Sequence, residues 1–132
     1  MTLEERKEKV KKLRAEGYNC AQAVVMAFSD LTGLDDATAA ATAAGLGGGV
    51  GGMKEICGVV TGMTIAYGLI TRAPASEKAK VYSQVRQLAS RFKDLNSDRM
   101  LCRELKAPGA AKSCNALIEE GVEILHHHCT ID

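Results

Sequence analysis

The spacing of apolar and polar residues along the chain predicts a series of helices. The first segment begins with the capping box Thr2-Leu3-Glu4-Glu5 and ends at Gly17. Leu3, Val10 and Leu13 form one narrow apolar stripe along it, and charged residues occupy most other positions. This pattern indicates a surface helix.

The second segment is apolar on nearly every side. Asn19, a strong N-cap with Gln22 three residues further on, precedes an apolar stretch over 21–31. We therefore expect a buried helix that carries Cys20 in its first turn. Asp35-Asp36 then open an alanine-rich helix over 37–44, which ends at a glycine-rich segment, 45–52.

An uncharged run lies between Glu55 and Arg72. Gly58, Gly62 and Ala66 recur in it at every fourth position, a spacing that allows another backbone to approach closely. We expect this run to be the central buried helix, entered through a glycine-rich turn. It is shorter than the ~20 mostly apolar residues of a membrane-spanning helix, so we expect no membrane-embedded segment here.

Three further helices are expected in the second half of the chain. An amphipathic helix should begin near Ser76, with an apolar face of Val81, Val85, Leu88 and Phe92. Ser97 is predicted to cap a short helix that carries Cys102. Beyond the Pro108-Gly109 turn, Ser113 is predicted to cap a last helix, whose apolar positions are Leu117, Ile118, Val122 and Leu125.

No segment alternates β-branched and polar residues in the manner of a strand. The predicted fold class is therefore all-α. We expect residues 1–132 to form one compact domain, a bundle of about five or six helices with the glycine-rich turn before the central helix.

The composition narrows the classes of partner. Seventeen basic and 16 acidic residues give a formal charge of +1, which offers no electrostatic argument for nucleic acid binding. The apolar fraction of 46% is compatible with a homodimer. The densely charged first residues do not resemble a secretory signal, so we expect a cytoplasmic location, where thiols are kept reduced.

The five cysteines are the candidate chemistry. Cys20 and Cys114 follow predicted N-caps, and Cys57 enters the central helix. A thiolate in the first turn of a helix is stabilised by the backbone N–H groups, so each of the three could ionise near neutral pH. Cys102 should be favoured as a thiolate by the basic residues around it, which are Arg99, Arg103 and Lys106.

The turn at Pro108-Gly109 makes Cys102 and Cys114 the likeliest disulfide partners, because it lets the chain double back between them. Two such thiols would suffice for dithiol–disulfide exchange, in which one attacks and the other resolves. Such chemistry requires no cofactor and would suit a thiol–disulfide oxidoreductase.

Two other interpretations of the cysteines remain open. The same four thiolates, Cys20, Cys57, Cys102 and Cys114, could hold an iron–sulfur cluster or zinc. The spacing disfavours a metal, because the closest pair has 11 intervening residues instead of the usual C-x2-C. Alternatively, the cysteines could pack as small apolar residues of a non-catalytic helical adaptor.

Two motifs are interpreted structurally. Gly47, Gly49 and Gly52 match G-x-G-x-x-G, but they follow a helix, so we favour a close-packed turn over a nucleotide site. In the tract His126–His128, successive side chains diverge, and only His126 and Cys129 share a face. We interpret this tract as a helix end whose dipole favours cationic histidines.

The cysteine pattern resembles that of the C-GCAxxG-C-C family, whose members are assigned a redox role. The resemblance rests on 17–23 (Gly-Tyr-Asn-Cys-Ala-Gln-Ala), the glycine tract, 57–62 (Cys-Gly-Val-Val-Thr-Gly), Cys102 and Cys114. Val59 stands where the family usually has alanine. The resemblance implies that Cys20, Cys57, Cys102 and Cys114 are the four characteristic cysteines and that Cys129 lies outside the set. It also implies a redox partner. Members are often encoded near transporter genes, so this partner could be associated with a transporter.

Overall fold

The protein is described by a computed structural model that covers residues 1–110 and 112–130. Within these residues the chain forms eight α-helices and two short 3-10 turns, and it contains no β-strand. The all-α prediction is therefore confirmed. The α-helices are α1 (Leu3–Ala15), α2 (Cys20–Met26), α3 (Ser29–Thr32), α4 (Asp36–Ala43), α5 (Gly58–Thr71), α6 (Lys78–Leu95), α7 (Cys102–Leu105) and α8 (Cys114–Cys129).

Local capping fixes where the first two long helices begin. The Thr2 hydroxyl accepts the backbone N–H of Glu5, and the Glu5 carboxylate accepts that of Thr2. Asn19 and Gln22 form the same reciprocal pair, at 2.8 and 2.9 Å. Both predicted capping boxes are present, so that Cys20 is the first helical residue of α2.

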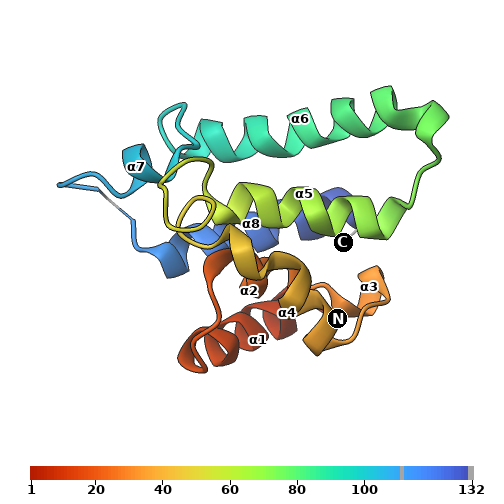
Figure 1. The fold of residues 1–132 in the computed structure, drawn as a ribbon, viewed down its shortest axis with the longest axis horizontal. Coiled ribbons are helices and arrows are strands. Elements are labelled where there is room, and N and C mark those ends of the chain that lie inside the picture. The colour runs from red at the N-terminus through yellow and green to blue at the C-terminus, as the bar shows by residue number, and fades with distance from the viewer. Residues whose placement is uncertain (111, 131–132) are drawn as a thin grey trace.

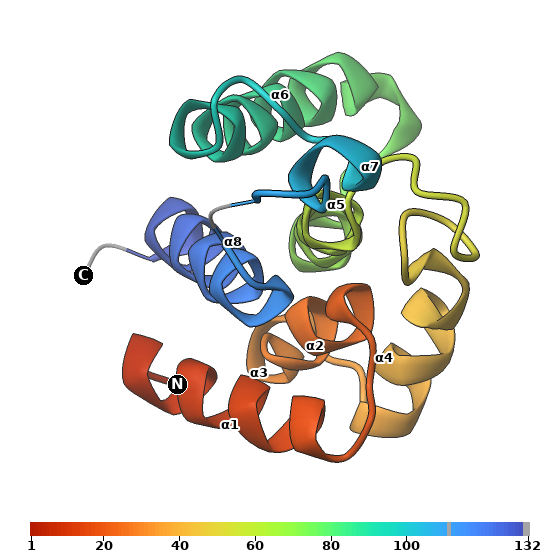
Figure 2. The ribbon, with the colours of Figure 1, turned by 90° about the vertical axis from the view of Figure 1, so that its left-hand side faces the viewer.

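The helices pack around α2, α5 and α8. Helix α2 lies against α5 on one side and against α4 on another, while α8 packs on α1 and α5 (Figure 2). Helix α6 runs beside α5 on the outside of the bundle (Figure 1). Phe28, Met63, Phe92 and Ile118 are fully buried in the core between these helices.

The second predicted helix is interrupted. Helix α2 ends at Met26, and α3 begins only at Ser29. Phe28 departs from helical geometry, with φ −113° and ψ 23°, and the Ser29 hydroxyl donates to the Met26 carbonyl. A serine that bonds back to a preceding carbonyl competes with the helical ladder, which explains the break.

The predicted cap at Ser97 is wrong. Ser97 and Asp98 have positive φ angles, and α7 starts at Cys102 without a side-chain cap. The preceding residues are extended instead, because Leu101 forms an isolated antiparallel β-bridge with Ile56. This bridge ties the start of α7 to the start of α5.

The glycine tract forms a left-handed turn. The five consecutive residues 48–52 all have φ between +58° and +77°, a region in which glycine carries no steric penalty. The backbone N–H groups of Lys54 and Glu55 donate to the carbonyls of Gly48 and Gly49, which closes the turn. The predicted close-packed turn is present, and Figure 1 shows it beside α7 and the start of α5.

The last helix follows its predicted cap and apolar face. The Ser113 hydroxyl accepts the Ala116 N–H at 3.1 Å. Leu117, Ile118, Val122 and Leu125 are all buried. No helix among the described residues has the length and apolar character needed to cross a membrane.

Candidate functional site

One cavity brings together cysteines from four separate helices. It has a volume of about 150 Å³. Its lining includes Cys20, Cys57, Cys102 and Cys114. We call this the four-cysteine cavity. Larger hollows of about 440 and 560 Å³ beside α6 contain no cysteine, so chemistry and not size distinguishes this site.

Each of these cysteines stands at the start of a helix. Cys20, Cys102 and Cys114 are the first residues of α2, α7 and α8, and Cys57 is the N-cap of α5. The sequence placed Cys20, Cys57 and Cys114 at helix starts, which the structure confirms. The fold therefore directs the N-terminal ends of these helices toward one point.

Cys20 and Cys57 are brought together by a close approach of α2 to α5. A β-carbon built at Gly58 would lie 2.5 Å from the Cys20 Sγ atom and 3.1 Å from the backbone nitrogen of Ala21. One turn later, a β-carbon at Gly62 would lie 2.9 Å from Val24. The small residues of α5 thus accept α2, as their four-residue spacing predicted.

Cys57 and Cys102 are brought together by the isolated β-bridge. The Cys57 N–H donates to the Met100 carbonyl at 2.8 Å, and the Cys102 N–H donates to the Glu55 carbonyl at 2.6 Å. Each cysteine follows one member of the bridged pair. In antiparallel pairing such positions are diagonal neighbours on the same face, with a separation of about 7–8 Å.

The glycine tract holds the cavity from the Cys102 side. A β-carbon at Gly49 would lie 2.6 Å from the Glu55 nitrogen and 2.8 Å from the Cys102 β-carbon. Only a residue without a side chain fits there. The tract therefore acts as a backbone wall against Cys102.

The prediction that Cys57 ionises near neutral pH is wrong. Burial, with a smaller contribution from the neighbouring thiols of Cys20 and Cys102, raises the pKa of Cys57 to about 11 despite the opposing effect of the backbone N–H groups of Val59 and Val60. Cys57 is only 6% exposed, so its thiolate would lose most of its hydration. The helix start does not compensate for this cost.

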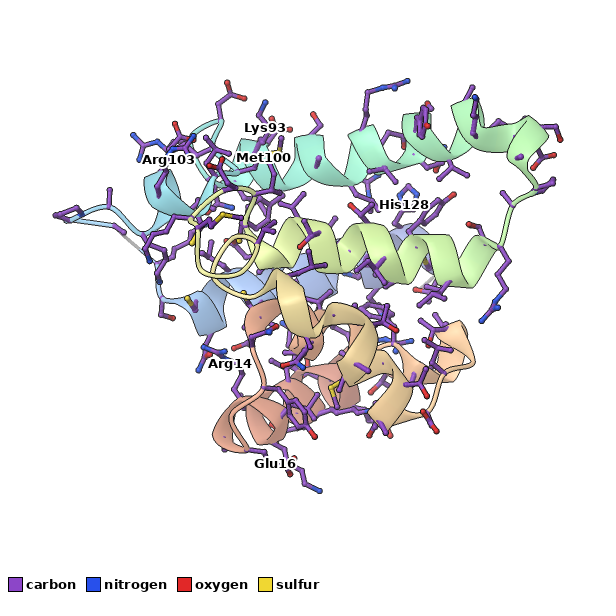
Figure 3. The ribbon with its side chains drawn as sticks, in the orientation of Figure 1. Arg14, Glu16, Lys93, Met100, Arg103 and His128 are labelled. Atoms are coloured by element: carbon purple, nitrogen blue, oxygen red, sulfur yellow. The ribbon has the colours of Figure 1, made fainter. Side chains whose placement is uncertain are left out.

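The basic residues near Cys102 have different positions. Lys106 lines the four-cysteine cavity, whereas the Arg103 guanidinium pairs with the Glu55 carboxylate at 3.0 Å and Arg99 lines another hollow. A cavity residue that the sequence did not indicate is Arg14, at the end of α1. Figure 3 shows Arg14 and Arg103 at the same end of the molecule. Nothing in the surface pattern of the first helix distinguishes Arg14 from its charged neighbours.

All five cysteines are free thiols in the structure. The structure therefore presents the reduced form of the site, and the Cys102–Cys114 pairing stays a prediction. Among the described residues, no group of three or more His, Cys, Asp or Glu side chains has the arrangement of a metal site.

The histidine tract lies outside the four-cysteine cavity, and its environment differs from the one that we predicted. His126 is 2% exposed, and its Nδ1 atom accepts a hydrogen bond from the Nε of Arg6 at 3.0 Å, so Nδ1 carries no proton. Burial and the charge of Arg91 lower the pKa of His128 below its ordinary value. His126 and His128 therefore do not match the interpretation as cationic histidines, whereas His127 lies 3.9 Å from the Glu123 carboxylate. Partial burial raises the pKa of Cys129.

Comparison with known proteins agrees with the cysteine pattern. No curated protein and no solved structure matches the chain. Residues 18–128 match the family described as "Putative redox-active protein (C_GCAxxG_C_C)". This match includes the four cavity cysteines and the glycine tract, and the chain accordingly belongs to the C_GCAxxG_C_C family.

Proposed function

We propose that the protein is a cytoplasmic thiol–disulfide oxidoreductase whose reactive centre is the four-cysteine cavity. The observation that carries this proposal is the presence of Cys20, Cys57, Cys102 and Cys114 on the wall of a single cavity. Dithiol chemistry needs two sulfur atoms that can reach each other after a small movement. Membership of a family with an assigned redox role points in the same direction.

Burial divides the cavity cysteines into two kinds. Cys20, Cys102 and Cys114 are half-buried, whereas Cys57 is buried and protonated at neutral pH. An exposed thiolate is the better attacking group, because the thiolate is the nucleophile and must reach its target. We therefore assign the first attack to a half-buried cysteine and the resolving step to Cys57.

The contacts support Cys57 as the common resolving partner. Cys20 lies against the adjacent Gly58, and Cys102 is a diagonal neighbour of Cys57 across the β-bridge. A mixed disulfide on either sulfur would be within a short movement of Cys57. This assignment differs from the Cys102–Cys114 pairing that the turn at Pro108-Gly109 predicts.

Peptide mapping after oxidation tests the function. The reduced protein is treated with one equivalent of a small disulfide, its remaining thiols are alkylated, and cross-linked peptides are identified by mass spectrometry. We expect an intramolecular bond that joins Cys57 to Cys20 or to Cys102. A Cys102–Cys114 bond would support the proposed function but contradict the assignment of Cys57 as the resolving cysteine.

A matched variant and a metal measurement complete the experiment. Cys129→Ser should oxidise like the wild-type protein, because Cys129 does not line the cavity, whereas Cys57→Ser should accumulate a mixed disulfide with the reagent. The proposal fails if the cavity cysteines form no intramolecular bond. It also fails if anaerobically purified protein contains stoichiometric iron or zinc that is lost with these cysteines.

A further inference from the structure

The wall of the four-cysteine cavity is almost entirely apolar, and the two charged residues that contribute to it are both basic. Arg14 and Lys106 line it, and none of its described lining residues is acidic. Glu55, whose backbone pairs with Cys102, directs its carboxylate to Arg103 at 3.0 Å. This carboxylate therefore already has a basic partner outside the cavity lining.

The two basic residues differ in how they are held. The Nε atom of Arg14 donates to the Asn115 side-chain oxygen at 2.8 Å, and its Nη1 atom donates to the Tyr18 carbonyl at 2.9 Å. These bonds fix the guanidinium between the end of α1 and the start of α8. Lys106 is exposed, and its side chain makes no hydrogen bond or ion pair within the described residues, so its ammonium group can turn toward a ligand.

The cavity also limits the size and character of its ligand. Val59, Leu105 and Leu117 supply apolar wall between the thiols. Its volume is about 150 Å³. A protein cavity of this volume can bind benzene, a ring of about six heavy atoms. A short aliphatic arm with one sulfur and one polar end would fill such a space. A folded protein substrate could reach it only with an extended tip.

We propose that the substrate is a small disulfide carrying negative charge, one half of which enters the four-cysteine cavity with its anionic group toward Arg14 and Lys106. The proposal rests on the thiol–disulfide function proposed above and adds the class of substrate. The N-terminal ends of α5 and α8, two long helices that begin at the cavity, contribute positive potential of the same sign.

The reaction balances as an exchange of one disulfide for another. A half-buried cysteine thiolate attacks the nearer sulfur of the substrate, the substrate S–S bond breaks, and one anionic thiolate departs. Cys57 then attacks the mixed disulfide, its proton passing to the second departing thiolate. Two protein thiols are oxidised to one protein disulfide, and the substrate is reduced to two small thiols.

Three small disulfides of similar length and different charge test this assignment. They are bis(carboxymethyl) disulfide, bis(2-hydroxyethyl) disulfide and cystamine, which are anionic, neutral and cationic at neutral pH. The oxidation rate of the folded protein with each is divided by the rate for the same chain unfolded in urea, which removes the intrinsic reactivity of the reagent. We expect the anionic disulfide to exceed the neutral one by about tenfold at low salt and the cationic one to be slowest, with the differences shrinking at high salt.

Charge variants locate the origin of the preference. Lys106→Gln should reduce the anionic-to-neutral rate ratio about threefold, and Lys106→Glu should reduce it further. Lys80→Gln is the control, because its side chain is 81% exposed on α6 and does not line the cavity. Equal normalised rates for all three disulfides, or an unchanged ratio in Lys106→Glu, overturn the anionic assignment while the proposed function stands. A folded protein that none of the three oxidises would overturn both.

Discussion

The sulfur of Cys20 lies directly against the backbone of Gly58, the residue that follows Cys57. The space between them is too small for a methyl group, since a β-carbon at position 58 would come within 2.5 Å of the Cys20 Sγ atom. The contact between α2 and α5 that requires a glycine at position 58 therefore also places the thiols of Cys20 and Cys57 close to each other.

Gly58→Ala should disturb this contact in a specific way. We expect a loss of about 1–3 kcal/mol in the free energy of unfolding, because the added methyl group forces Cys20 or the backbone of Ala21 to move. Urea denaturation measures the loss. The double variant Gly58→Ala with Cys20→Ala should recover part of it, since the clashing sulfur is then absent.

Gly68 supplies the matched control within the same helix. A β-carbon there would meet nothing within 4 Å, so Gly68→Ala should stabilise the protein by about 0.4–1 kcal/mol. If both glycine variants change stability equally, or if the Cys20→Ala rescue fails, the close approach of α2 to α5 does not have the role described.

Alkylation should separate Cys57 from the other cavity cysteines. At pH 7, a pKa of about 11 instead of the ordinary 9.0 reduces the thiolate fraction about a hundredfold, and burial slows the reagent further. Iodoacetamide followed by mass spectrometry should label Cys57 last among the four. Labelling of Cys57 at the rate of Cys20 or Cys114 would contradict its assignment as the resolving thiol.

Cys57 should also make the protein sensitive to alkali. Its pKa is higher in the folded state, so the folded protein holds the thiol proton more tightly than the unfolded chain does. The resulting stability is fully present below pH 9 and is lost as the pH rises through about 11. The two-unit shift corresponds to about 2–3 kcal/mol.

The contribution of Cys57 is measured by difference. Urea denaturation of the wild-type protein and of Cys57→Ala is compared at pH 8 and pH 11, because other groups of the chain also titrate in alkali. The wild-type protein should lose more stability than the variant. Parallel losses in the two proteins would show that Cys57 titrates with an ordinary pKa.

A fourth prediction concerns the buried Arg6 that anchors α1. Its guanidinium is 1% exposed, contacts the Ala27 carbonyl at 2.8 Å, Asp30 at 2.6 Å and His126 at 3.0 Å, and lies 4.3 Å from the ring centre of Phe28. Arg6→Gln should cost about 1–3 kcal/mol in urea denaturation, because it removes the donors to the Ala27 carbonyl and to the partly exposed Asp30, which keeps the N-terminal amine as a partner.

Acid should weaken the ion pair between Arg6 and Asp30. Partial burial opposes ionisation of Asp30, but the hydrogen bonds from Arg6 and the N-terminal amine lower its pKa below 3.8 overall. A lowered folded pKa gives stability that is present above the ordinary pKa and lost as the pH falls through the folded one. The stability difference between wild type and Arg6→Gln should therefore shrink as the pH falls below 3.8, and a constant difference would argue against the ion pair.

The helix starts could be predicted from the sequence because their signals are local. Asn19 with Gln22, and Ser113 with the N–H of Ala116, form bonds within three residues. The break after Met26 and the bridge between Ile56 and Leu101 could not be predicted in this way. Both depend on contacts with distant parts of the chain, which override local propensity.

The same distinction holds at the candidate site. The place of Cys20, Cys57 and Cys114 at helix starts followed from the sequence, but the convergence of these cysteines and Cys102 depends on how α2, α5, α7 and α8 pack. The raised pKa of Cys57 follows from burial, which the sequence pattern does not quantify. Arg14 enters the cavity only because α1 docks against α8.

The wall behind Cys102 is formed by the turn over residues 48–52, whose backbone conformation is unusual for L-residues. Its residues all have positive φ angles, a conformation that costs a chiral L-residue about 1–2 kcal/mol and costs glycine almost nothing. Val50 is the one residue in it that has a stereocentre. The position of the Cys102 sulfur thus depends on neighbours that lack handedness, and at Gly51 and Gly52, where a β-carbon would meet nothing within 4 Å, a mutation would act through stereochemistry alone.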